Sequence, residues 1–127
     1  MSRQAEITKL IKETASLIVV NAKSLADAQG RASEFLGIQF LLINYLKDLE
    51  VAKAKQDALT TALYNNAFMN SASSTATEKK VDATSDGAHA EANIKLQTIN
   101  AEIHWIKSNV DIFKNAHVLF RQYSRES

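Results

Sequence analysis

The stretch "FLGIQFLLINYLKDLEVAKAKQDALTTAL", residues 35–63, decides the fold of this chain. Apolar residues recur in it at alternating steps of three and four, which is the spacing of one helix face that packs along another helix. The members of this stripe are Phe35, Ile38, Leu42, Tyr45, Leu49, Ala52, Gln56, Leu59 and Leu63, with only the glutamine as an interruption. The spacing predicts one long helix over residues 33–68.

The first half of this stretch carries a second set of apolar residues, Leu36, Phe40, Leu41 and Ile43. A helix that is apolar on most of its circumference is buried by more than one neighbour. We therefore expect this half to be covered nearly all round, and the half after Lys47 to be covered along one stripe only.

A second long helix is predicted over residues 88–123. One stripe steps by three and four along it, and another apolar stripe lies on an adjacent face. Two apolar faces on one helix predict two neighbours. The first stripe is Leu96, Ile99, Ile103, Ile106, Val110, Phe113, His117 and Phe120, and the second is Trp105, Ile112, Leu119 and Tyr123.

The remaining segments are a first helix and a polar connection. The apolar spacing predicts a helix over residues 3–29, with Gly30 as the break before the next helix. Residues 70–87 are small and polar, which favours a loop. Within it, Thr75 and Glu78 have the spacing of a capping box, so a short helical turn is expected to begin there.

Composition restricts the class of protein. The chain has 127 residues, no cysteine, no proline and a formal net charge of +1. This length predicts a single domain over residues 1–127, and the absence of proline favours long helices. The most apolar stretch, residues 35–46, is shorter than the roughly 20 residues that span a bilayer. We therefore expect no membrane span and a cytoplasmic protein.

The predicted fold class is all-α, an elongated helical hairpin or bundle of about three long helices with coiled-coil-like packing. A helix of about 36 residues is about 54 Å long, so these helices form a rod that buries its stripes poorly alone. A symmetric homo-oligomer supplies the missing cover. The candidate interface residues are Phe35, Phe40, Leu41, Ile112 and Leu119.

No catalytic pattern is present in the sequence. The three histidines, His89, His104 and His117, lack the spacing of a metal site, and the chain has neither a His-Glu-x-x-His motif nor a glycine-rich phosphate loop. His117 lies on an apolar stripe, which favours a packed histidine. We therefore expect no enzyme, no metal, no cofactor and no small-molecule substrate.

Basic residues recur near the C-terminus at Lys107, Lys114 and Arg121, and Arg125 follows four residues later. One interpretation is that these cations flank a helix–helix seam and pair with acids on a partner helix. The other is that they bind phosphates of single-stranded nucleic acid while Trp105 and Tyr123 stack on bases. The sequence leaves both open.

Two segments resemble parts of the UvsY-type recombination mediators of large phages. They are "LEVAKAKQDALTTALYNNA", residues 49–67, and "VDIFKNAHVLFRQ", residues 110–122, and the order of helices and polar insertion is also similar. The resemblance implies a small helical oligomer that binds single-stranded DNA and loads a recombinase in the cytoplasm of the host cell. Residues 59–62, Leu-Thr-Thr-Ala, depart from that family's basic stretch, so Lys53 and Lys55 are the nearest candidates for DNA contact.

The sequence thus favours a non-enzymatic, self-associating helical protein, with a recombination mediator as its most specific form. The alternative is a structural or secretion-type assembly component, such as a filament subunit, a scaffold or a helical chaperone, with no nucleic-acid role.

Overall fold

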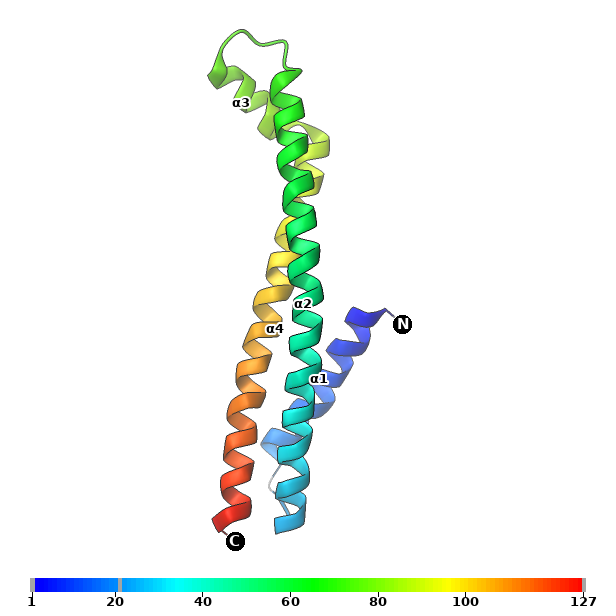
Figure 1. Ribbon diagram of the computed structural model, residues 1–127, viewed down its shortest axis with the longest axis vertical. Coiled ribbons are helices and arrows are strands. Elements are labelled where there is room, and N and C mark those ends of the chain that lie inside the picture. Colours follow the sequence, from blue (N-terminus) through cyan, green and yellow to red (C-terminus); the bar gives the residue numbers. More distant parts are fainter. Residues whose placement is uncertain (1, 21, 127) are drawn as a thin grey trace. The chain divides into compact units, whose positions relative to one another are not determined.

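The protein is described by a computed structural model that covers residues 2–20 and 22–126. The helices are α1 (Arg3–Val19), α2 (Leu25–Met69), α3 (Ala76–Ser85) and α4 (Gly87–Glu126) (Figure 1). The described residues contain no β-strand. The prediction of an all-α helical bundle is therefore confirmed, whereas symmetric assembly and coiled-coil packing stay predictions.

The break after the first helix lies earlier than predicted. α1 ends at Val19 and α2 begins at Leu25, so the predicted helices 3–29 and 33–68 and the break at Gly30 are wrong in their bounds. Ser24 starts α2 because its Oγ accepts a hydrogen bond from the Asp27 backbone N–H at 3.0 Å, while Asp27 Oδ2 accepts one from the Lys23 N–H at 2.9 Å. This reciprocal cap outweighs the cost of about 1 kcal/mol for Gly30 inside a helix.

The predicted polar loop contains a helix. Thr75 Oγ1 accepts a hydrogen bond from the Glu78 N–H at 3.2 Å, so the helix start predicted at this residue is confirmed. α3 runs for ten residues from there, and Asp86 then caps α4 by accepting a hydrogen bond from the His89 N–H at 3.1 Å. Residues 70–87 are thus a short capped helix between two short connections.

The chain divides into two compact units. Unit 1 comprises residues 1–46 and 105–127, and unit 2 comprises residues 47–104. α2 and α4 each contribute to both units. The prediction of a single domain stays a prediction.

Unit 1 is built from α1, the first half of α2 and the second half of α4. Its largest fully buried side chains are Phe35, Phe113, Leu42 and Ile106. The Phe35 ring stacks on Phe113 with centroids 6.1 Å apart and meets the Phe120 ring at 5.2 Å. The stripes predicted for these halves of the two long helices therefore face each other in the core.

Two polar side chains cross the same seam. His117 Nδ1 lies 2.8 Å from the Ala32 carbonyl oxygen, which only accepts, so the Nδ1–H tautomer donates this bond. Gln39 Nε2 donates to the Phe113 carbonyl at 3.4 Å and to the Phe35 carbonyl at 3.1 Å. The bonds to Ala32 and Phe113 join the two helices and fix the register of α2 against α4, and His117 has the packed role that the sequence favours.

Unit 2 is built from the second half of α2, α3 and the first half of α4. Gln56, the interruption in the predicted stripe, donates from Nε2 to the Ala92 carbonyl at 3.0 Å. The Tyr64 ring meets the His89 ring edge-on at 5.3 Å, and Lys79 lies over the Phe68 ring at 6.0 Å. Ala83 is fully buried and attaches α3 to this unit.

Within one chain, the first half of α2 is not covered all round, and cover by a second copy stays a prediction. Phe40 is 63% exposed, and Leu36, Leu41 and Ile43 are exposed as well. α1 and α4 cover only two sides of α2 within unit 1, because one face of the helix packs on each. The second apolar stripe of α4 is likewise exposed at Trp105, Ile112, Leu119 and Tyr123.

Candidate interaction surface

Arg31 fixes the position of α1 in unit 1. Its guanidinium is buried, donates to the carbonyl of Leu17 at 3.0 Å and also to that of Val20, and forms an ion pair with Asp27 at 3.1 Å. Carbonyl groups at a helix C-terminus lack partners within their own helix and carry partial negative charge. A cation from α2 therefore satisfies the end of α1, and it also lies over the Phe120 ring of α4 at 5.7 Å.

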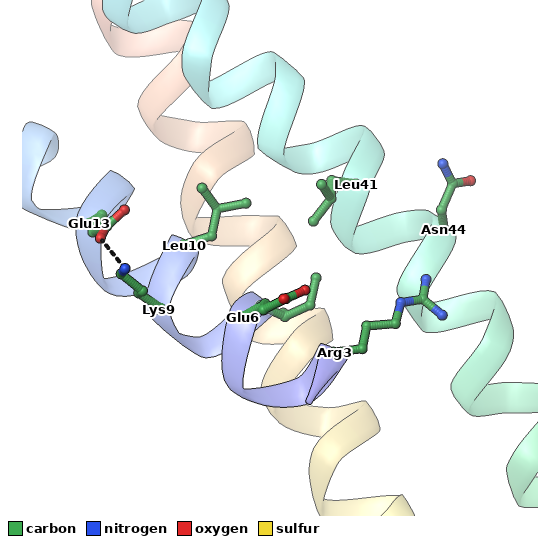
Figure 2. A pocket seen from close by; sticks show the side chains of 8 residues that line it. Arg3, Glu6, Lys9, Leu10, Glu13, Leu41 and Asn44 are labelled. Carbon is green, nitrogen blue, oxygen red and sulfur yellow. Dashed lines mark ion pairs between the residues drawn. The ribbon is translucent and has the colours of Figure 1, made fainter. Parts of the chain in front are cut away.

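A groove of about 900 Å³ opens between α1 and α2 within unit 1 (Figure 2). Figure 2 shows Leu10 of α1 and Leu41 of α2 on its two walls, with charged side chains along α1. Lys9 and Glu13 form an ion pair at 3.8 Å, while Arg3 lies over the Tyr45 ring at 5.0 Å. The lining carries both signs of charge, so the groove selects no ion and suits a mixed polar and apolar segment.

The basic residues near the C-terminus form a cation row along one side of α4, defined as Lys107, Lys114, Arg121 and Arg125. All four side chains are exposed. Asp111 lies within the row and dilutes its charge. The row is therefore an accessible strip of positive charge on unit 1.

The two aromatic candidates lie on the other side of α4. Trp105 is two residues before Lys107, and Tyr123 is two residues after Arg121, in one continuous helix. Residues two apart on an α-helix point about 200° away from each other. Trp105 and Tyr123 are exposed, but they do not face the side on which the cations lie. The expectation that both groups share one nucleic-acid surface is corrected by this helical phase.

The five candidate interface residues divide into one buried residue and four exposed residues. Phe35 has no exposed surface, because it fills the seam between α2 and α4, so its assignment to a subunit interface is corrected to a core role. Phe40 and Leu41 of α2 and Ile112 and Leu119 of α4 are all exposed. These four remain available for contact with another molecule.

The other two basic candidates, Lys53 and Lys55, lie on α2 in unit 2 and are exposed. Unit 2 also contains a polar cluster around Asp82, whose Oδ2 accepts hydrogen bonds from Ser71 at 2.5 Å and Ser73 at 2.6 Å. These two bonds, first that of Ser71 and then that of Ser73, lower the pKa of the Asp82 carboxyl. The cluster ties the connection after α2 to α3.

Within residues 2–20 and 22–126, no three side chains of His, Asp or Glu come together as metal ligands. None of the helices in this described part of the chain is long and apolar enough to cross a membrane. Comparisons with known family models, curated proteins and solved structures found no match to this chain.

Sequence reasoning missed Arg31, which organises one end of unit 1. Two signals were present: Ser24 and Asp27 have the spacing of a capping box, and Arg31 follows four residues after Asp27. Its contact with the carbonyls of α1 had no signal, because those carbonyls come near α2 only after the chain reverses between Val19 and Leu25.

Proposed function

We propose that the chain is a non-enzymatic, self-associating helical interaction protein. The observation that carries this proposal is the apolar stripe left exposed on α4, where Ile112 is 50% and Leu119 41% exposed. These residues are seven apart and Trp105 continues the same line, which is the register in which helices pack along one another. Exposed apolar residues in this register are typical of a helix face that contacts another molecule.

The test is the mass of charged variants by size-exclusion chromatography with light scattering. Ile112→Asp and Leu119→Asp place a carboxylate on the stripe, and burying it costs several kcal/mol without a partner. Both variants are expected to form smaller species while circular dichroism reports unchanged helix. Asn93→Asp is the matched control, because it adds the same charge to an exposed position of α4 that lies about five helical turns before Ile112. Wild-type mass in both stripe variants would contradict the proposal.

A second candidate function, recombination mediation, is favoured by the exposed cation row and by the resemblance to UvsY-type mediators. In it, the oligomer binds single-stranded DNA and assists a recombinase, and Lys53 and Lys55 add contacts from unit 2. The cation row supports this candidate, but the aromatic residues do not, since Trp105 and Tyr123 face away from the row. The net charge of the chain is only +1, but in an oligomer the cation row is repeated in every copy, which increases the positive charge that can meet DNA.

The test of this candidate is a titration of an oligothymidine at several salt concentrations. The triple variant Lys107→Ala, Lys114→Ala, Arg121→Ala is expected to weaken binding and to flatten the slope of log K against log salt by about 0.7 for each phosphate that is no longer neutralised. Binding that does not depend on the row would contradict the candidate. A protein that does not bind DNA and forms assemblies of indefinite length would instead support the filament-subunit alternative.

A further inference from the structure

Within unit 1, α2 packs on α4 with one side and on α1 with another, and a third side has no neighbouring helix in the described part of the chain. Phe35 points at α4, and Arg31 and Ile38 point about 40–60° to one side of it, toward α1. Leu36, Phe40 and Ile43 point about 80–140° to the other side and are exposed. They form an apolar strip on the face of unit 1 that α1 does not cover.

The same construction applies to α4. Phe113 points at α2, and Leu119 and Tyr123, which line a groove with Ile18 of α1, point about 80–120° to one side of it. The cation row points about 80–120° to the other side. Because α2 and α4 are neighbours along the Phe35–Phe113 seam, the row and the apolar strip border the same open face of unit 1.

The spacing on this face fits a helix. Leu36, Phe40 and Ile43 are spaced by four and three residues, which is the repeat of a seam between two helices. Lys107, Lys114 and Arg121 are spaced by seven, which is the repeat of the charged residues that flank such a seam. Among the side chains that the structure describes, Lys114, Arg121 and Arg125 form no ion pair.

Charge identifies the occupant. A second copy that docked this face on itself by two-fold symmetry would bring the cation row against either the same row or the apolar strip of the other copy, and neither supplies acidic partners. The groove between α1 and α2 is no better partner, since its lining carries both signs of charge. Single-stranded DNA needs stacking surfaces beside its phosphate contacts, and Trp105 and Tyr123 lie on the opposite side of α4. An amphipathic helix with acidic residues can pack its apolar side on the strip and pair its acids with the row.

We propose that the open face of unit 1 binds an amphipathic helix of another protein, with an apolar stripe that packs on Leu36, Phe40 and Ile43 and acidic residues that pair with the cation row. This goes beyond self-association through the Ile112 and Leu119 stripe, which lies on a different side of α4. The acids of the partner recur every seven residues along it, in step with the row.

The probe is a dye-labelled synthetic helix with leucine at the two seam positions of each heptad and glutamate at the flanking positions. Its anisotropy is measured against the full-length protein at low salt, beside a matched peptide with lysine in place of each glutamate and an oligothymidine. The glutamate peptide is expected to bind and the lysine peptide is not. The double variant Lys114→Ala, Arg121→Ala is expected to weaken binding about tenfold, or about threefold for each exposed ion pair.

Phe40→Ser tests the apolar strip, and a comparable loss is expected because it removes the most exposed member. Lys12→Ala is the control, since Lys12 is an exposed cation of α1 away from this face. Absence of binding by the glutamate peptide overturns the proposal, as does equal binding of both peptides. Loss of oligothymidine binding in the double variant with the peptide unaffected assigns the row to DNA, and a fall in the mass of the protein in Phe40→Ser assigns the strip to a second copy. Either result also overturns it.

Discussion

The sharpest test of the fold compares two phenylalanines on one helix. Phe35 has no exposed surface and contacts the rings of Phe113 and Phe120, with centroids at 6.1 and 5.2 Å. Phe35→Ala removes the ring from a packed core and leaves a cavity, which costs about 3–5 kcal/mol. Phe40 lies five residues later on the same helix but is 63% exposed, so we expect Phe40→Ala to change stability by less than about 1 kcal/mol.

The measurement is urea unfolding followed by circular dichroism at 222 nm, at two protein concentrations so that any contribution of assembly is visible. The difference between the two variants is expected to exceed about 2 kcal/mol at both concentrations. Equal effects of the two substitutions, or a larger effect at Phe40, would refute the orientation of α2 in unit 1. The open face of unit 1 would then be misplaced with it.

Three further predictions follow from polar contacts. Arg31→Met should cost about 1–3 kcal/mol in urea unfolding by removing the donor to the end of α1, whereas Arg125→Met at an exposed site should cost almost nothing. The pKa of Asp82 should lie below 3.8 by carboxyl NMR and should return toward 3.8 in the double variant Ser71→Ala, Ser73→Ala. Because the pKa of Asp82 is lower in the folded state, its hydrogen bonds stabilise the folded protein above pH 3.8. This stabilisation is lost as the pH falls through the folded-state pKa. Thr75→Ala should speed amide exchange in the first turn of α3 by about fivefold, from the loss of about 1 kcal/mol of capping, without a comparable change in α4.

The long helices were predictable because their apolar residues are periodic. The predicted start of α4 at residue 88 is one residue from its start at Gly87. Its first predicted stripe contains the buried side chains Leu96, Ile103, Ile106, Phe113 and Phe120. The break before α2 lies earlier than predicted because the cap formed by Ser24 and Asp27 outweighs the cost of Gly30 inside the helix. Helical spacing also identifies which residues share a face but not which neighbour covers that face, so the sequence did not show that Phe35 packs on α4 while Phe40 stays exposed.

The candidate site was predictable only in part. The exposure of Lys107, Lys114, Arg121 and Arg125 agrees with either interpretation of the sequence. The separation of Trp105 from Lys107 could have been found by counting residues, since neighbours two apart on a helix point away from each other. That the row borders the same face as Phe40 depends on how α2 and α4 pack, and no local pattern carries that information.

The most direct test of self-association is the mass of the wild-type protein by sedimentation equilibrium over a hundredfold range of concentration. The chain mass is 14.0 kDa. We predict a species of a fixed multiple of this mass that dissociates only at the lowest concentrations, because the exposed Ile112 and Leu119 stripe is covered in the assembly. A mass of one chain at every concentration would contradict the account.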